Sequence, residues 1–478
     1  MLTNQRSTYF SLLALMLLIA VPIGFIAGAN PMNLGLVFGA IPAVIFFFAR
    51  FEQAVIGLLI LRSALDPFSG QQLPAAFAIA LNALTILYVV VQLLTRKRVR
   101  TDKFWWVFAA WVALQGLWLV LMYFGGLGLD ASYLPISIRE WVRILSWLMI
   151  YLLVMQLQDK MHPEQLVSKL FLALIVPSTV ALMQIFVPFL LPAVFVGGGG
   201  DGGSPVESVS RINGTLGHPN TFATFLLLFF GLTLWKLGLA KERKWIWLSL
   251  LGMLAFLYAS TKALFALGML GVFLLVFIAP KLSVPKLVGG VLLFGIALAL
   301  FGSTEFGQQR LASLANTPLL NPNIDISRAI LLSTADGNSF NWRLAQWTFL
   351  IQAWQEHPIF GYGLATCKYL TTLVAYAHND YVRALAEGGL VGFGAFLLFL
   401  MAQLIRLLQL FWIAPAGSGQ RNLCLILIAV FVGTLMGMLT ENIWSHTTLF
   451  FYWWTLIAVA GWNWDEKIMN EELGGAGL

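Results

Sequence analysis

The sequence predicts an all-α protein, a polytopic transmembrane helical bundle of about twelve to fourteen spans. Two observations lead to this fold class. The chain of 478 residues is 59% hydrophobic and only 10% charged, with a mean hydropathy of +0.84, whereas soluble domains carry about 25% charged residues. The apolar residues also occur in long runs, and roughly 20 such residues are enough for a helix to cross a bilayer.

The apolar runs give the expected spans in order. They are 8–27, 32–49, 53–65, 73–95, 104–124, 141–157, 166–187, 219–240, 245–260, 262–279, 286–302, 386–412, 422–440 and 445–463. The run at 53–65 is short, and almost nothing separates 245–260 from 262–279, so those two should form a tight hairpin. No small-residue cleavage site follows the first run, which is therefore read as a span and not as a cleaved signal.

The runs divide the chain into three parts. We expect an N-terminal transmembrane bundle at 1–302, a large loop at 303–385 that carries the catalytic residues, and C-terminal spans with a cytoplasmic tail at 386–478.

Basic residues predict the orientation of the bundle. The densest clusters, at 96–100 and 241–244, fall in alternate connections, and Lys and Arg favour the cytoplasmic side. Both termini should then be cytoplasmic, and the polar connections 125–140, 197–218 and 303–385 lie outside. The net charge of +7 is dispersed between spans and forms no stripe, so we expect the lipid bilayer and no nucleic acid as a partner.

The two cysteines predict neither a disulfide framework nor a metal site. Cys367 falls in the long loop and Cys424 in an apolar run, so the two should face different environments.

Most cations expected outside flank the polar connections or the tight hairpin. Cations at the membrane boundary are functional candidates. The cations that flank these segments are Arg139, Arg143, Arg211, Lys262, Arg310, Arg328, Arg343, Lys368 and Arg383.

The long loop should hold one helix and the start of another. Residues 303–340 are rich in Asn, Ser, Thr, Pro and Gly and look irregular. A helix is predicted at 341–356 with Arg343, Trp347 and Trp354 on one face. A second helix should begin near Ala377 and place His378 and Tyr381 together. Within it, Asp380–Arg383 and Arg383–Glu387 have the spacing of helix-supporting charge pairs.

The histidines in the outer connections are candidates for proton transfer. His378 shares its loop with several Arg and aromatic residues, and a neutral imidazole can accept a proton from a sugar hydroxyl. The alternative for His378 is a helix cap. His357 precedes a proline and is interpreted as structural, and His446 is a weaker candidate. His218 opens a span, where it either lines the site or caps the helix.

Metal-binding signatures are not found in the sequence. There is no phosphate-binding glycine loop ending in Lys-Ser/Thr, no His-Glu-x-x-His and no Asp-x-Asp pair, and outer acidic residues are sparse. We therefore expect no catalytic metal and no cofactor, with Arg and Lys neutralising a pyrophosphate instead.

Four motifs together resemble the O-antigen ligase and polymerase superfamily of bacterial envelope glycosyltransferases. They are Arg211-Ile212-Asn213-Gly214-Thr215-Leu216-Gly217-His218-Pro219-Asn220, Arg343-x-x-x-Trp347, His357-Pro358-Ile359-Phe360-Gly361-Tyr362-Gly363, and Ala377-His378-Asn379-Asp380-Tyr381 followed by Leu385-x-Glu387-x-Gly389-x-x-Gly392. The pattern covers about half of the chain, and the N-terminal spans match only in being hydrophobic.

The resemblance implies a GT-C-like membrane glycosyltransferase of the bacterial inner membrane with a periplasmic active site. Such enzymes move a glycan from undecaprenyl pyrophosphate to lipid A-core or to another glycan. The family's histidine corresponds to His378 and its loop arginine to Arg343. A second family arginine falls at Ser260-Thr261-Lys262, where this chain has Lys one residue later and so lacks the guanidinium fork.

The resemblance also suggests roles for neighbouring residues. His378 would act as base or position the acceptor in a direct inverting displacement, and Arg343 would bind the pyrophosphate. The other expected substrate-binding residues are Lys262, Arg211, Arg139, Arg143, Trp347, Tyr381, Asn379 and His218. The aromatic residues would stack on sugars or anchor the interface.

Three alternatives stay open from sequence. Inside the superfamily, an O-antigen or exopolysaccharide polymerase or a protein O-oligosaccharyl ligase would share the donor chemistry. A transporter predicts paired charges inside spans and an internal repeat, and neither is visible. A non-catalytic scaffold would not need Arg and His in one loop.

Overall fold

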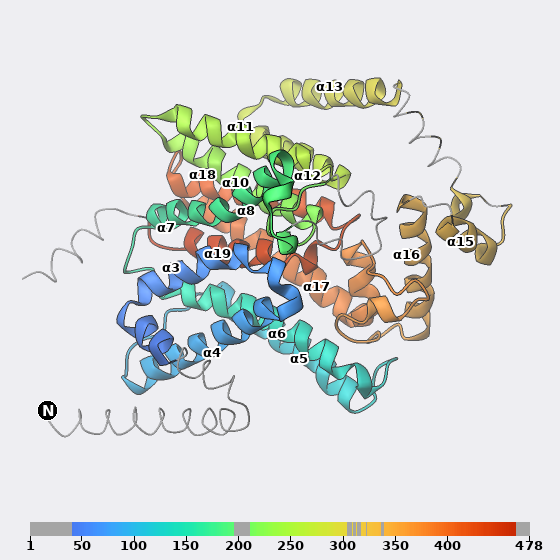
Figure 1. Cartoon of the computed structure of the whole chain (residues 1–478), viewed down its shortest axis with the longest axis horizontal. Helices are drawn as coiled ribbons and strands as arrows, with labels where there is room; N and C mark the ends of the chain where they lie inside the picture. Colours follow the sequence, from blue (N-terminus) through green and yellow to red (C-terminus); the bar gives the residue numbers. More distant parts are fainter. Residues whose placement is uncertain are drawn as a thin grey trace, which may run out of the picture.

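The computed structural model describes residues 41–195, 211–303, 308, 312, 317–321, 323–335 and 339–464. Over these residues the chain is helical and contains no strand, which confirms the all-α membrane bundle (Figure 1). The helices are α3 (Phe51–Leu61), α4 (Leu73–Leu94), α5 (Lys103–Tyr123), α6 (Leu134–Met155), α7 (Pro163–Leu170), α8 (Ile175–Phe186), α10 (Pro219–Leu239), α11 (Lys244–Ser260), α12 (Leu264–Ile278), α13 (Val284–Ser303), α15 (Ile326–Ala335), α16 (Ser339–Glu356), α17 (Asp380–Ile413), α18 (Gly419–Gly437) and α19 (Thr447–Ala460).

Fewer helices of the structure are long and apolar enough to span a membrane than the twelve to fourteen spans expected from the sequence. Among the described residues, six helices are long and apolar enough to cross a membrane, or seven if the bent pair Ile41–Ala49 and Phe51–Ala64 is one span. Three further apolar helices, α11, Phe265–Ile278 and α19, are shorter. The expected span 8–27 and the first half of 32–49 lie outside the described residues. The short run at 53–65 belongs to the bent pair, whose two helices differ in direction by 117°.

The bundle interior is rich in aromatic side chains. Trp147, Trp454, Phe108 and Phe399 are almost fully buried in its main apolar cluster. α6 packs against α4, α5 and α19, while α18 packs against α10, α12 and α17. These contacts join helices from both ends of the sequence, and they hold the connection between α18 and α19 deep in the molecule.

Glycines let three of these helices approach closely. A Cβ added to Gly231 of α10 would lie 2.8 Å from Ile426, and one added to Gly433 of α18 would lie 3.0 Å from the backbone oxygen of Met269 in α12. Lipid is as apolar as the helix surfaces, so association inside a bilayer depends on such close packing.

The long loop is more ordered than its composition suggests. The helix expected at 341–356 is α16, and the helix expected near Ala377 is α17, which starts at Asp380 and passes through the proposed boundary at 385. The prediction of irregular structure at 303–340 is wrong for Ile326–Ala335, because those residues form α15. In Figure 1, α13 lies at the edge of the bundle, and α16 packs beside α17.

Candidate active site

A buried glutamate in the turn between α18 and α19 connects the residues predicted from sequence. Glu441 accepts hydrogen bonds through Oε1 from the backbone N–H of Asn442 at 3.0 Å and pairs with Nδ1 of His378 at 3.0 Å. Its Oε2 accepts from the side-chain amide of Asn220 and lies 3.9 Å from Nη2 of Arg343. Four separate segments, α10, α16, the start of α17 and the α18–α19 turn, therefore meet at this carboxylate.

Glu441 is held in its ionised form. Burial alone would raise the pKa of this carboxyl, but His378, Arg343 and His446 more than offset that effect and hold the pKa well below its usual value. An ionised carboxylate can only accept hydrogen bonds. The proton in the 3.0 Å contact therefore belongs to Nδ1 of His378, which leaves Nε2 as the nitrogen that can accept a proton.

The backbone places His378 directly before α17. Its φ is +48°, a left-handed conformation that is uncommon for a residue with a Cβ and is concentrated at functional sites. Its N–H donates to Oδ1 of Asn442 at 2.8 Å, and the ring of Trp342 approaches the imidazole edge-on at 5.8 Å. The side chain stays 20% exposed, so the ring is fixed at one edge and reachable from outside the bundle.

Arg343 approaches the same carboxylate from α16. Its side chain is 26% exposed, and at 3.9 Å it is at the limit of an ion pair with Glu441. α16 is fixed against the loop that precedes His378, because Gln346 donates to the carbonyl of Ala375 at 2.6 Å and accepts from the hydroxyl of Thr371 at 2.9 Å. A guanidinium beside an imidazole, both partly exposed, suits an anionic substrate with a nearby hydroxyl.

Arg211 reaches the site indirectly. Its Nη2 donates to Oδ1 of Asn220 at 2.8 Å, and its Nε donates to the carbonyl of Thr261 at 3.0 Å. Asn220 in turn donates to Glu441. The prediction that Arg211 belongs to the site thus has geometric support through one intermediate side chain.

The other two histidines near Glu441 have structural contacts. Nδ1 of His218 accepts from the N–H of Asn220 at 3.1 Å and so caps α10, as expected for one of its two interpretations. His446 is buried and lies 2.9 Å from the hydroxyl of Thr224. Burial lowers the pKa of His446 to about 3, so this ring is neutral near physiological pH.

Three predicted substrate-binding residues have structural contacts of their own. Oδ1 of Asn379 caps α17 by accepting from the N–H groups of Tyr381 and Val382. The hydroxyl of Tyr381 donates to the carbonyl of Leu435 at 2.9 Å. The indole N–H of Trp347 donates to the carbonyl of Ala377 at 2.6 Å. These residues support the backbone around His378, and their contacts do not require a sugar.

Arg139 and Lys262 are exposed, and no contact links them to the Glu441 cluster among the described residues. Lys262 has a φ of +51° and directly follows Thr261, whose carbonyl binds Arg211. It therefore lies close in sequence to the cluster, and its side chain is open to solvent or lipid. Arg139 lies on the exposed side of α6.

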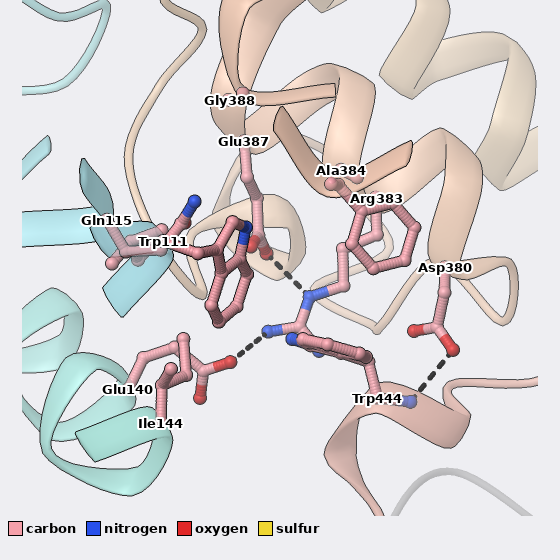
Figure 2. A pocket seen from close by; sticks show the side chains of 13 residues that line it. Trp111, Gln115, Glu140, Ile144, Asp380, Arg383, Ala384, Glu387, Gly388 and Trp444 are labelled. Atoms are coloured by element: carbon pink, nitrogen blue, oxygen red, sulfur yellow. Dashed lines mark hydrogen bonds and ion pairs between the residues drawn. The ribbon is translucent and has the colours of Figure 1, made fainter. Parts of the chain in front are cut away.

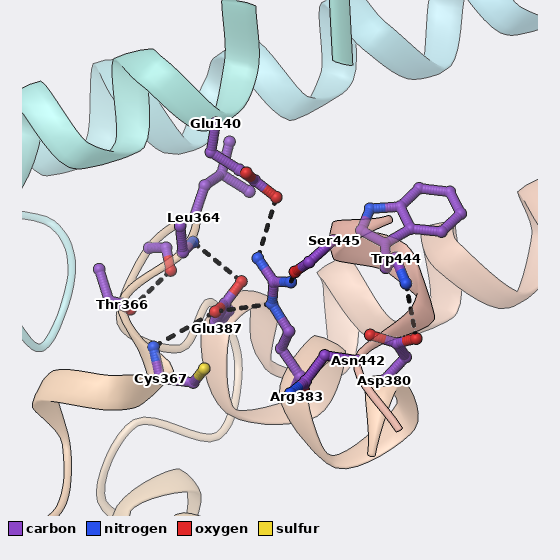
Figure 3. Close-up of polar contacts among 12 residues, drawn as sticks. Glu140, Leu364, Thr366, Cys367, Asp380, Arg383, Glu387, Asn442, Trp444 and Ser445 are labelled. Atoms are coloured by element: carbon purple, nitrogen blue, oxygen red, sulfur yellow. Dashed lines mark hydrogen bonds and ion pairs between the residues drawn. The ribbon is translucent and has the colours of Figure 1, made fainter. Parts of the chain in front are cut away.

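A second network of charges packs on the other side of the α18–α19 turn (Figure 3). Arg383 donates to Glu140 at 2.9 Å, to Glu387 at 3.0 Å and to the hydroxyl of Ser445 at 2.7 Å. The expected Arg383–Glu387 pair is confirmed. The expected Asp380–Arg383 pair is wrong, because Asp380 faces the turn and accepts from the N–H of Trp444 at 2.8 Å.

Arg143 belongs to this second network and not to the His378 cluster. It pairs with Glu140 and donates to the carbonyl of Trp444 at 2.7 Å, and its guanidinium stacks over the ring of Trp147. A cavity of about 50 Å³ in this network is lined by Glu140, Arg383 and Trp444 among others (Figure 2). The contacts of Arg143 thus hold the turn that carries Glu441, and its predicted substrate contact stays a prediction.

The described part of the chain contains no group of three or more His, Cys, Asp or Glu side chains that could hold a metal ion. Both cysteines are free and buried. Metal independence stays a prediction.

Sequence reasoning missed Glu441 and Asn220 as site residues. The available signal was a lone carboxylate between two apolar runs, which is costly unless it has a purpose. Its partners come from four distant segments, so the spacing along the sequence could not identify them.

Comparison with protein families gives one match. Residues 246–397 match the family described as O-antigen ligase (Wzy_C). This region of the chain belongs to the O-antigen ligase family. The region contains Arg343 and His378 and ends before Glu441. A search of curated proteins finds no match.

The family match and the apolar helices agree on a general description. The chain carries several helices that are long and apolar enough to cross a membrane, and its residues 246–397 are similar to the O-antigen ligase family. The matched region spans α11 to the middle of α17, so α10, α18 and α19 complete the cluster from outside the O-antigen ligase region.

Proposed function

We propose that this protein is an inner-membrane glycosyltransferase that moves a glycan from undecaprenyl pyrophosphate to an acceptor on the periplasmic face. Within the family we assign it as an O-antigen ligase that attaches polysaccharide to lipid A-core. The observation that carries the proposal is the contact of Nδ1 of His378 with the ionised Glu441, beside the guanidinium of Arg343.

The mechanism is a single inverting displacement. Nε2 of His378 accepts the proton of the acceptor hydroxyl while that oxygen forms a bond to the anomeric carbon of the donor. The bond from this carbon to the phosphate oxygen breaks, and undecaprenyl pyrophosphate leaves with the electron pair. Glu441 stabilises the imidazolium that forms, as a carboxylate does in acid–base triads.

Arg343 has the complementary role at the leaving group. A guanidinium offers paired N–H donors to phosphate oxygens, and negative charge grows on the pyrophosphate as the bond breaks. Stabilising charge where it develops is a major source of rate enhancement. Arg211, held through Asn220, supplies a second positive charge near the same cluster.

The decisive experiment measures transfer from purified lipid-linked donor to acceptor, together with donor binding. His378→Ala should lower kcat by a factor of about 10² to 10⁴ and leave donor binding little changed. The matched control is His357→Ala, an exposed histidine that packs on Tyr362, which should keep nearly full activity. Weaker donor binding with unchanged kcat in His378→Ala would show that His378 is a binding group.

The pH–rate profile gives an independent readout. Protonation of His378 removes the base, so activity should fall on the acidic side in wild type, and this limb should disappear in His378→Ala. Glu441 does not produce the limb, because its depressed pKa keeps it ionised to lower pH.

Glycan analysis of a deletion strain separates ligase from polymerase. Lipid-linked polymer accumulating beside bare lipid A-core supports the ligase assignment. A single repeat unit attached to the core would show that the protein is a polymerase.

A further inference from the structure

A second candidate binding site lies at the far end of the bundle from His378. A cavity of about 720 Å³ opens between the start of α5 and the C-terminal half of α17. Arg406 in its wall is 17 residues after the break of α17 at Gly389, which corresponds to roughly 26 Å of helix at 1.5 Å per residue, and His378 lies on the other side of that break. The start of α5 in the opposite wall follows the basic cluster at 96–100, which is expected on the cytoplasmic side, so we place the cavity and the His378 cluster at opposite membrane surfaces.

The polar end of the cavity carries one uncompensated positive charge. Both carboxylate oxygens of Asp102 already accept hydrogen bonds. Its Oδ1 accepts from the N–H of Trp105 at 2.7 Å. Its Oδ2 accepts from the hydroxyl of Tyr151 at 2.9 Å and from Nη2 of Arg406 at 2.6 Å. The exposed Lys103 next to this pair adds the remaining charge.

Arg406 also has an unused donor. Its Nε is buried and has no hydrogen-bond partner within the described part of the chain, and an unsatisfied buried donor costs free energy. The side chain as a whole is 18% exposed, and its ion pair with Asp102 uses Nη2, so the accessible part of the guanidinium can bind a phosphate oxygen with a charge-assisted hydrogen bond.

The other end of the cavity is apolar and faces lipid. Trp106 is 63% exposed, and Val107 and Ile405 are about half exposed, although all three belong to candidate membrane spans. A tryptophan at the end of a span is typical of the depth of lipid headgroups. The cavity thus combines a cationic polar end with an apolar wall, at the depth where headgroup and acyl chain join.

We propose that this cavity binds one anionic phospholipid in the leaflet opposite the His378 site. Lys103 and Arg406 take the phosphate, and an acyl chain lies along Trp106, Val107 and Ile405. The net charge of +1 from Asp102, Lys103 and Arg406 matches a single phosphodiester. A zwitterionic lipid adds a cationic group for which the cavity walls offer no further carboxylate.

The test uses the full-length protein purified in detergent with equal amounts of phosphatidylglycerol and phosphatidylcholine, and counts retained lipid by native mass spectrometry. Wild type should retain phosphatidylglycerol preferentially. Lys103→Ala should lower that retention by about five-fold, the usual effect of one basic residue near a lipid surface. Arg98→Ala is the matched control, since it removes an exposed charge five residues away and outside the cavity.

A second variant tests the apolar wall with all charges intact. Ile405→Trp fills the cavity and should also reduce phosphatidylglycerol retention. Equal retention of the two lipids, an Arg98→Ala effect as large as that of Lys103→Ala, or full retention by Ile405→Trp would each overturn the proposal. The elution profile on size exclusion identifies any variant that misfolds, and Lys103→Gln then replaces Lys103→Ala.

Discussion

At the scale of single residues, Glu441 determines what His378 can do. The carboxylate occupies Nδ1 of the ring at 3.0 Å, so the proton-accepting nitrogen is the one that faces away. Glu441 itself has only 3% of its surface exposed and does not need to touch the substrate. In the proposed mechanism it is a positioning residue that acts through the imidazole.

Replacing Glu441 by Gln should therefore lower kcat by about 10² or more, while donor binding changes little. The amide is neutral and no longer stabilises an imidazolium. For the same reason the acidic limb of the pH–rate profile should move to lower pH. Steady-state kinetics across pH 4–8 measure both effects. An unchanged limb with reduced donor affinity would show that Glu441 acts on substrate binding and not through His378.

Arg343 should be needed as a guanidinium and not only as a charge. Arg343→Ala should abolish transfer and leave membrane insertion intact, because the side chain is partly exposed and makes only a 3.9 Å contact with Glu441. Arg343→Lys should be clearly impaired as well, since a point charge cannot replace a fork of donors. Transfer assays with membranes of matched protein content check this, and full activity in Arg343→Ala would rule out the pyrophosphate role.

Some residues of the cluster could be predicted from the sequence, and others could not. Arg343 and His378 were predictable because each lies in a recognisable motif of a polar loop. The contact of Tyr381 with α18 could not be predicted, because its hydroxyl donates to the carbonyl of Leu435, which is 54 residues away in the sequence. Arg143 was likewise expected at the substrate, but packing against Trp147 and Trp444 draws it into the second network.

At the scale of elements, α17 is broken at Gly389, and the break is used for packing. Gly389 has φ +60° and ψ −163°, a conformation that is essentially restricted to glycine. The N–H of Leu390 donates instead to the carbonyl of Pro358 at 2.8 Å, and the N–H of Gly363 donates to the carbonyl of Glu387 at 2.8 Å. The loop after α16 thus satisfies backbone groups that the helix leaves open.

Gly389→Ala should destabilise the protein by roughly 1–3 kcal/mol. The added Cβ would lie 2.3 Å from the backbone oxygen of Ile359, so the loop must move. The matched control is Gly394→Ala in the same helix, where a Cβ meets no atom within 4 Å, and this change should be neutral or slightly stabilising. Thermal unfolding in detergent compares the two, and equal melting temperatures would contradict the argument.

Sequence patterns predicted the helices better than their breaks. The apolar run 219–240 and the helix at 341–356 correspond closely to α10 and α16, because long apolar runs and helix-ending His-Pro and Gly signals are local. The bend between Ile41–Ala49 and Phe51–Ala64 and the helix α15 were missed. Tertiary packing and capping decide such features, and composition does not report them.

At the scale of the whole molecule, the turn 441–446 joins the two polar networks. On one side Glu441 pairs with His378. On the other side the carbonyl of Trp444 accepts from Arg143, the hydroxyl of Ser445 accepts from Arg383, and the N–H of Trp444 donates to Asp380. Removing one member of a buried charged network leaves its partners unsatisfied. The turn that carries Glu441 is consequently fixed by groups outside the His378 cluster.

The same distribution of charge argues for chemistry without a metal. Three carboxylates of the two networks are already paired with Arg or His side chains, and Asp380 accepts from the backbone N–H of Trp444. Glu140 and Glu387 bind Arg383, and Glu441 binds His378. A divalent ion would have to displace these cations, whereas a pyrophosphate can bind the guanidinium of Arg343 directly. Activity should accordingly survive EDTA at concentrations that strip loosely held divalent ions.

The measurement is in vitro transfer with and without chelator, using a metal-dependent glycosyltransferase in the same buffer as the positive control. That control should lose activity and recover it with Mg²⁺ or Mn²⁺, while this protein should change by less than about two-fold, within the scatter of such rate comparisons. Loss of transfer that Mg²⁺ or Mn²⁺ restores would place a metal among the paired carboxylates. The metal ion would then share the role proposed for Arg343, because a cation that bridges phosphate oxygens stabilises the same developing charge.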